Sequence, residues 1–545
     1  MSDHRGQAER RGSWTLVAAW GGLIALLLIN LPAFLCMGLD SDASSYDLVA
    51  RRVALGGVHY RDLLDANLPG IVWLHMVFRS LLGWRSEALR MADFTIVALS
   101  AWLLVTWLPR SSLAWRRVAL AGGLLAFYLS TSEWVHCQRD VWMLLPALSA
   151  LRLRARQTDR LAIQATTFWA LAGWALVEGM AWAAAFWIKP FVAVPAATAW
   201  LIAAKQTCGT TGAKRRVAVD LVALLAGGLL VGTAGITWLF TTGAWPTFVE
   251  VMFVWNREYF AFNVLGSEPW IPLLSLVLRL FPWVLVHLAA VPLAVDAIWW
   301  KNRRAPSAFP LLAGFYLAWL SQAILLQHLY DYVHVPPILL GVAVLAVSGC
   351  VREAPRTSSL LARLRAYPAV SAFMLFCLLW SYPALLAQRA AAWVQCVTEG
   401  STPAVRDRVT VLRRLNWTNL DLVTKFLRDQ GVRDREVTSF SLPTVALYGD
   451  LDLAPSTRYI FLQDHLDIFA KRRSLILAAL ANSRQKFLVC DLGRYNMQRV
   501  RESLDDKSGP QGRQVAFRAG DYVVFRLGGA EMPAWLDQHF TLSTE

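Results

Sequence analysis

The sequence predicts a polytopic α-helical membrane protein, with about eleven spans, that ends in a soluble α/β domain. Hydrophobic residues make up 56% of the 545 residues and charged residues only 17%, whereas soluble domains have about a quarter of their residues charged. The mean hydropathy is +0.42. The apolar residues come in blocks, such as 14–37 and 367–387, that are long enough to cross a hydrocarbon core of about 30 Å. This composition excludes a disordered, collagen-like or small disulfide-stapled protein.

The net charge of +15 fits a membrane protein better than a nucleic-acid-binding protein. Lys and Arg gather in short tracts between apolar segments, as cytoplasmic loops require, and no nucleic-acid recognition motif accompanies them. The seven Cys are scattered without a C-x-x-C pair. They predict small buried side chains rather than a disulfide framework or a zinc site.

The distribution of basic residues predicts that the N-terminus is cytoplasmic. Residues 1–13 carry three Arg and precede an apolar block that is too long for the core of a signal peptide. The alternate connections hold only Arg139, Lys189 and Arg257. Basic clusters instead recur at 110–117, 152–160, 205–216, 301–304 and 352–365. The short connections therefore assign these clusters to the inner face and their alternates, 131–139, 179–189, 242–270 and 327–334, to the outer face.

Segment 71–84 is apolar but is not counted as a span. It is short and contains His75 and Arg79, and counting it would move the later basic clusters to the outer face. We predict an interfacial or re-entrant helix there. The predicted spans are 14–37, 91–108, 117–132, 140–152, 163–178, 184–204, 217–241, 271–299, 307–326, 335–350 and 367–388.

Three regions follow from this topology. They are a cytoplasmic N-terminus at 1–13, a transmembrane domain at 14–389 with a large extracytoplasmic first loop at 38–90, and an extracytoplasmic soluble domain at 390–545. In the soluble domain, helical stretches at 419–430 and 467–481 alternate with apolar, strand-like runs at 436–440, 486–490 and 522–526. This alternation predicts a small α/β fold.

The first loop holds the candidate reactive residues. Asp42, Tyr46 and Val49 recur at helical spacing, and Gly56–Gly57 provide a helix stop. Asp42 would then lie at the N-terminus of an interfacial helix. Helix capping alone would explain a carboxylate there.

The order of motifs around Asp42 resembles the large-loop signature of the GT-C superfamily. Tyr46 follows Asp42 by four residues, then come Gly-Gly-x-x-Tyr-x-Asp at 56–62, Asp-x-Asn-x-Pro-Gly at 65–70, and Arg90. This superfamily contains polyprenyl-phosphate-sugar-dependent glycosyltransferases, including protein O-mannosyltransferases and lipid A aminoarabinose transferases. The resemblance covers about 14–390 and is strongest over 38–90.

The resemblance implies a hexosyl- or pentosyltransferase that uses a sugar on undecaprenyl or dolichyl phosphate and an extracytoplasmic lipid, glycan or protein acceptor. It implies that an acidic residue after the first span is the general base. Asp42 matches by its spacing to Tyr46, and Asp40 is the alternative. A carboxylate can accept the proton of a sugar hydroxyl as the new bond forms. The leaving lipid phosphate needs cations rather than an acid.

The candidate cations are Arg139 and Lys189. Arg139 and Asp140 form a charged pair at the outer end of a predicted span, and related bacterial proteins carry a similar Gln-Arg-Asp or Gln-Arg-Glu. Lys189 lies before Pro190 within an apolar stretch. Charges at such depth are functional hypotheses by default. A snorkelling Lys or a structural ion pair is the competing interpretation.

Further residues are predicted to line the substrate site. Asp62 and Asn67 belong to the loop motifs, and Tyr330 and His334 lie in an outer connection where aromatic anchoring at the interface is an equal alternative. The 247–260 connection is amphipathic and could close over the lipid or lie at the interface. Relatives often have a second acidic residue where this chain has Ala43, and Lys in place of Asn67.

No His, Asp and Glu set has recognisable metal spacing. We therefore predict that no cofactor is required, and the sequence does not exclude a divalent metal. The expected location is the inner (plasma) membrane of a bacterium. The alternative function is a transporter or flippase for a lipid-linked or polyanionic substrate. Transporters often show half-repeats and interrupted helices, and no internal repeat is visible here.

Overall fold

The computed structural model describes residues 2–110, 112–162, 167–207, 213–265, 270–299, 308–327, 330–350, 367–381, 387–412, 415–493 and 515–539. It divides into two compact units. Unit 1 comprises Met1–Cys36, Glu87–Gly235 and Glu268–Gly400, and unit 2 comprises Met37–Ser86, Ile236–Ser267 and Ser401–Glu545. The basic clusters at 301–304 and 352–365 lie outside the described residues.

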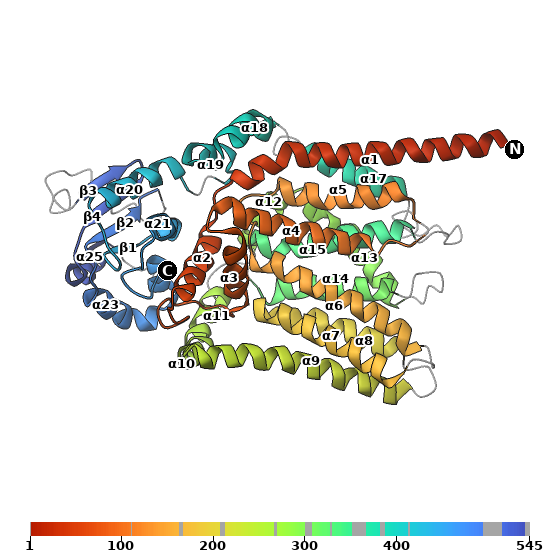
Figure 1. Ribbon diagram of the computed structural model, residues 1–545, viewed down its shortest axis with the longest axis horizontal. Coiled ribbons are helices and arrows are strands. Elements are labelled where there is room, and N and C mark those ends of the chain that lie inside the picture. The colour runs from red at the N-terminus through yellow and green to blue at the C-terminus, as the bar shows by residue number, and fades with distance from the viewer. Residues whose placement is uncertain are drawn as a thin grey trace. The chain divides into compact units, whose positions relative to one another are not determined.

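Unit 1 is a bundle of apolar helices, whose long members run side by side (Figure 1). Helices that are close in the sequence pack together in the bundle. Helix α6 packs against α7, and α13, α14 and α15 pack against one another. The helices are α1 (Ser2–Cys36), α4 (Ser86–Val105), α5 (Ala114–Ser130), α6 (Arg139–Ala162), α7 (Phe168–Ile188), α8 (Ala193–Thr207), α9 (Ala213–Thr241), α12 (Trp270–Leu280), α13 (Val286–Trp299), α14 (Phe309–Leu325), α15 (Asp331–Cys350), α17 (Tyr367–Trp380) and α18 (Gln388–Glu399).

Several of these helices can cross a membrane. Among the described residues, five are long and apolar enough by length and composition, or six if one bent pair counts as a span. They are Trp14–Cys36, Ser86–Val105, Phe168–Ile188, Lys214–Thr241 and Asp331–Cys350. A helix also lies at each other predicted span. The chain is therefore a mainly helical, polytopic membrane protein.

One predicted span and one predicted connection differ from the helices of the structure. The span at 271–299 is not one helix, because Leu273–Leu280 and Trp283–Trp299 meet at 105°. Pro282 lies at the break, and proline lacks the N–H that an uninterrupted helix needs. The outer connection predicted at 179–189 is also wrong, since α7 continues to Ile188. The helix ends at Lys189, with φ −157° and ψ 122°, because the following Pro190 disfavours the helical region for the residue before it.

Unit 2 contains a four-stranded sheet in the order β1-β2-β4-β3. The strands are β1 (Val437–Ser439), β2 (Phe487–Asp491), β3 (Val515–Ala519) and β4 (Tyr522–Arg526). β1 pairs with β2 in parallel, and β4 pairs antiparallel with both β2 and β3. The predicted strands at 436–440, 486–490 and 522–526 agree with β1, β2 and β4 to within one residue. β3 was not predicted, because its face is mostly half-exposed and a bulge between Val515 and Phe517 interrupts its alternation.

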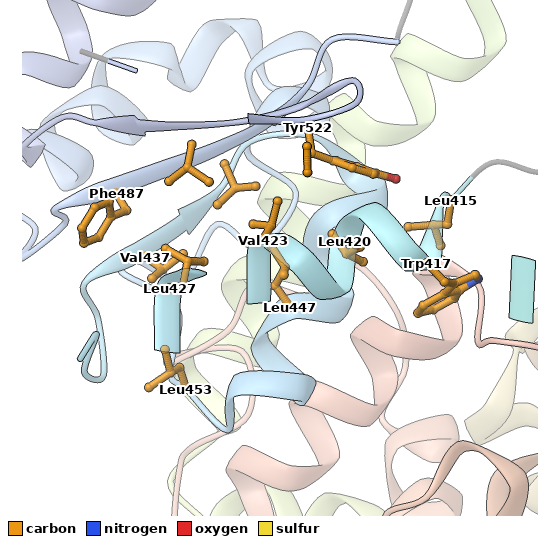
Figure 2. Packing of buried hydrophobic residues seen from close by; sticks show 13 residues of the cluster. Leu415, Trp417, Leu420, Val423, Leu427, Val437, Leu447, Leu453, Phe487 and Tyr522 are labelled. Carbon is orange, nitrogen blue, oxygen red and sulfur yellow. The ribbon is translucent and has the colours of Figure 1, made fainter. Parts of the chain in front are cut away.

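Helix α20 (Trp417–Asp429) covers one face of this sheet. Its side chains Leu420, Val423 and Leu427 lie in the same buried cluster as Val437 and Phe487 of the strands (Figure 2). The predicted helix at 419–430 is thus confirmed, whereas the one at 467–481 is broken into three pieces. The remaining helices of the tail are α19 (Pro403–Val409), η5 (Leu442–Val445), α21 (Ala446–Leu451), α22 (Leu462–Ile468), η6 (Ala470–Arg472), α23 (Arg473–Ala481), η8 (Gly529–Glu531) and α25 (Met532–His539).

Unit 2 also contains the first loop and the 245–265 connection. The first loop forms α2 (Ser41–Ala54) and α3 (Gly70–Leu82). The connection forms α10 (Trp245–Glu250), the π-helix η2 (Val251–Trp255) and α11 (Asn256–Leu265). Helix α2 packs against α21 and η5, and α11 contacts α22. The first loop and the 245–265 connection therefore pack with the tail of the chain.

Candidate active site

Helix α2 places the predicted base in its first turn. Asp40 is the N-cap residue, and its backbone carbonyl accepts from the Ser44 N–H at 2.8 Å. Asp42 lies in the first turn and is half-buried, whereas Asp40 is only 4% exposed. Tyr46 is buried one turn further on. The predicted helix and the position of Asp42 near its start are confirmed.

A buried charged cluster joins α2 to α3. One oxygen of the Asp47 carboxylate accepts from Arg79 Nε at 2.7 Å and pairs with His75 Nδ1 at 3.1 Å. Arg79 also donates to the Gly83 carbonyl at 3.0 Å, and the His75 ring lies edge-on to Tyr46 at 5.9 Å. Burial raises the pKa of Asp47, but hydrogen bonds and charges from His75 and Arg79 outweigh it and hold this pKa below its usual 3.8. The cluster fixes the rotation of α2, and hence the direction in which Asp42 and Tyr46 point.

Replacing Asp47 by Asn is expected to lower the stability of unit 2 by about 3 kcal/mol, because it leaves the nearly buried Arg79 without its ion pair. The lowered pKa of Asp47 means that its contribution is present above pH 3.8 and is lost as the pH falls below that value. Thermal unfolding of the purified protein from neutral to acidic pH should show the two proteins converging at the acid end. Asp421, whose side chain is half-buried and paired with the exposed Lys425, provides the control, and Asp421→Asn should have little effect. An equal effect of both substitutions would contradict the assignment.

The first of the two Gly-containing motifs forms a tight turn. The Asp62 carboxylate accepts from the Val58 N–H at 2.8 Å and from Arg61 Nε at 2.7 Å. Burial raises the pKa of Asp62, but these partners outweigh it and lower the pKa. Asp62 therefore has a local structural role that competes with its predicted place in the substrate site.

The second motif folds onto the first. The Asp65 carboxylate accepts from the side chain and the backbone N–H of Asn67 at 2.7 and 3.0 Å, and it contacts His59 at 3.2 Å. The fully buried Tyr60 stacks on His59 at 3.8 Å and donates to the Asn67 carbonyl at 2.8 Å. The spacing of these motifs therefore reflects a loop that is held together by its own side chains.

Unit 1 brings Lys189 and Asp140 together. Lys189 Nζ lies 2.8 Å from both carboxylate oxygens of Asp140, and both residues are buried. The sequence had instead grouped Asp140 with its neighbour Arg139, which is half-buried at the start of α6. The end of α7 at Lys189 explains this pairing, because the helix break lets the Lys side chain reach α6.

His334 and Tyr330 lie at the start of α15. His334 is buried and within electrostatic range of Lys189 and of His287. Tyr330 stacks on Tyr332 at 5.5 Å, and the Trp134 ring lies edge-on to Tyr330 at 5.7 Å. The aromatic residues therefore join the 131–138 connection to α15. His287, whose Nδ1 lies 2.8 Å from the Tyr316 hydroxyl, was not predicted.

Two other buried polar clusters of unit 1 were not predicted either. Asp93 accepts from the Trp142 indole at 2.7 Å and the Tyr128 hydroxyl at 2.8 Å. A lone carboxylate inside the predicted span 91–108 was the available signal. In the second cluster, Arg154 binds Glu178 at 2.8 Å and Asp220 at 2.7 Å, and all three side chains are 1% exposed. This cluster ties α6, α7 and α9 together.

Among the described residues, no group of three or more His, Cys, Asp and Glu side chains is arranged to hold a metal ion.

Comparison with known proteins supports the architecture. No protein-family model and no curated protein matches the sequence. The structure of ArnT from Cupriavidus metallidurans bound to undecaprenyl phosphate is similar, with a TM-score of 0.52 and 14% identity over 94% of this chain and 97% of that chain. The chain has the GT-C fold.

A second similar solved structure has a lower TM-score. The archaeal oligosaccharyltransferase AglB from Archaeoglobus fulgidus, in complex with an inhibitory peptide and a dolichol-phosphate, has a TM-score of 0.47 and 10% identity over 90% of this chain and 70% of that chain. The similarity to ArnT extends over nearly the whole length of this chain and therefore includes residues of both units.

Proposed function

We propose that the chain is a membrane glycosyltransferase that moves a sugar from a polyprenyl-phosphate carrier to an acceptor outside the cytoplasm. The observation that carries this proposal is the full-length similarity to an ArnT structure that holds undecaprenyl phosphate. The half-buried carboxylate of Asp42 at the start of α2 and the buried Lys189 of unit 1 supply the residue types that the reaction needs.

In the proposed reaction the acceptor hydroxyl attacks the anomeric carbon of the sugar. The bond from that carbon to the phosphate oxygen breaks, and the lipid phosphate leaves with the bonding electrons. Asp42 accepts the hydroxyl proton. Lys189, which is paired with Asp140, and Arg139 stabilise the charge that develops on the phosphate.

The proposed setting is the inner membrane of a bacterium, with eleven spans, the N-terminus inside and the tail outside. The burial pattern of α3 supports its place at the interface. Its charged residues His75 and Arg79 are buried, whereas Val77, Leu81 and Leu82 are 52%, 74% and 49% exposed. A helix with apolar side chains outward and charges inward fits contact with lipid rather than with water.

A reporter that is active only outside the cytoplasm should be active when fused to the C-terminal end of the chain. The alternation of basic clusters predicts an odd number of crossings, which places the tail opposite the N-terminus. The same reporter fused before Trp14 should be inactive. Activity of a cytoplasm-only reporter at the C-terminal end would overturn the proposed orientation.

The purified protein should release the lipid carrier when it is incubated with a panel of undecaprenyl-phosphate sugars and candidate acceptors. Thin-layer separation of the labelled carrier lipid measures this release directly. Carrier binding or flipping without release for the whole panel would favour the transporter over the transferase.

A further inference from the structure

Two arginines of the tail hold the connection that follows α9, which we call the outer segment (residues 245–265). Arg458 Nη2 lies 3.1 Å from a carboxylate oxygen of Glu250. Arg472 Nε lies 3.0 Å from a carboxylate oxygen of Glu258. The two pairs lie on either side of the π-helix Val251–Trp255, and π-helical turns are frequent at functional positions.

The same arginines enclose Trp255, which is fully buried. The guanidinium carbons of Arg458 and Arg472 lie 5.2 and 4.9 Å from the centre of its ring, within the range of cation–π attraction. Its indole N–H donates to Glu250 at 2.7 Å, and the Phe469 ring packs against it edge-on at 4.9 Å. One face of the outer segment is therefore bound to the tail through a buried indole and two ion pairs.

Backbone groups of the first loop form hydrogen bonds to Arg458 and to the outer segment. The Arg458 carbonyl accepts from the Leu64 N–H at 2.8 Å, and Asn256 Nδ2 donates to the Ala66 carbonyl at 3.1 Å. A substitution at Arg458 changes the side-chain contacts of the outer segment and leaves this backbone contact to Leu64 available.

The opposite face of the outer segment is open and mostly apolar, with one exposed charged residue, Arg257. Phe253, Val254 and Phe260 are 68%, 42% and 46% exposed. The segment begins only a few residues after α9, whose Lys214–Thr241 stretch is apolar enough to span a membrane. At the junction, the rings of Phe240 and Trp245 stack at 4.6 Å. Aromatic residues at the end of a span are typical of the boundary between lipid and water.

We propose that the outer segment is a membrane-surface anchor whose apolar face, formed by Phe253, Val254 and Phe260, contacts bilayer lipid, and that Arg458 and Arg472 are the residues that hold it in this orientation. An amphipathic helix at an interface places its apolar side chains among the acyl chains. With Trp255 bound to the tail, the three exposed side chains are left to face the lipid. The four charged partners are partly exposed to solvent, so each ion pair alone contributes little stability. The orientation of the outer segment therefore depends on both pairs, Arg458–Glu250 and Arg472–Glu258, which we call the clamp.

The test uses the full chain in phosphatidylcholine nanodiscs that contain a spin-labelled phosphatidylcholine as quencher. A bimane fluorophore on Phe253→Cys should be quenched strongly. A matched probe on Lys425→Cys, an exposed charged position of α20, should be quenched weakly. The double variant R458E/R472E should reduce quenching at position 253 to the level at position 425. The fourfold variant R458E/E250R/R472E/E258R, which exchanges the signs of both pairs, should restore it.

Each other result would overturn the proposal. Equal quenching at positions 253 and 425, when Arg458 and Arg472 are unchanged, means that the apolar face does not contact lipid. Unchanged quenching in R458E/R472E means that the arginines do not orient the segment. A loss that the fourfold variant does not restore assigns the effect to misfolding. A change at position 253 only when undecaprenyl phosphate is added would assign the face to the carrier instead of the bilayer. None of these readouts depends on transferase activity, so the proposed function is tested separately.

Discussion

The Asp42→Asn variant is expected to lose roughly 10²–10⁴-fold in kcat, with expression and donor binding intact, because a general base of this kind contributes about that much. Asn keeps the shape of the side chain and most of its ability to stabilise the first turn of α2. If Asp42 only interacted with the helix N-terminus, the variant would lose at most about 1 kcal/mol of stability and stay active. Release of undecaprenyl phosphate from a sugar-linked donor, measured at saturating donor, separates the two interpretations.

Asp40→Asn is the matched control, since Asp40 lies two residues before Asp42 and is the N-cap residue of the same helix. Its carboxylate makes no capping hydrogen bond to α2, and its variant should lose much less activity. If Asp40→Asn were inactive and Asp42→Asn active, the base would be Asp40. If both variants stayed active, the proposed mechanism would be wrong.

Removing the Lys189–Asp140 pair is expected to raise the apparent KM for the lipid donor by roughly 10- to 100-fold, the range that the loss of a hydrogen bond to a charged group produces. Lys189→Met alone is unsuitable, because it leaves the fully buried Asp140 without a partner, which costs about 3–5 kcal/mol. The double variant Lys189→Met/Asp140→Leu replaces both charges by apolar side chains and should keep nearly normal thermal stability. Initial rates over a range of donor concentrations measure the effect.

The double variant distinguishes a phosphate contact from a structural ion pair. Normal stability together with a normal donor KM would assign Lys189 and Asp140 to structure alone. Arg139 is the half-buried neighbour of Asp140, and Arg139→Ala should also raise the donor KM. The variant should lower kcat as well if the contact between Arg139 and the phosphate strengthens while negative charge develops on the leaving phosphate. Unchanged donor kinetics in both variants would remove the proposed phosphate site from this region.

Local patterns were sufficient for much of the fold. The apolar blocks correspond to helices of unit 1, and the spacing of Asp42 and Tyr46 before Gly56 corresponds to α2, which ends at Ala54. The runs at 436–440, 486–490 and 522–526 correspond to β1, β2 and β4. These features depend on hydrophobic period, glycine and cap residues within a few positions of one another, and such short-range signals can be interpreted from the chain alone.

The partners of the charged residues could not be found in this way. Lys189 binds Asp140 across 49 positions, Arg79 binds Asp47 across 32, and Arg458 reaches Glu250 across 208. No local period records which distant segments meet. From the sequence, the charged side chains of α3 indicated only that this segment is unlike a membrane span. In the structure they are buried and pair with Asp47 of α2. Residue type and spacing specify where helices and strands form, but a buried charge acquires its partner only when helices from different parts of the chain pack, because an unpaired charge costs too much inside a protein.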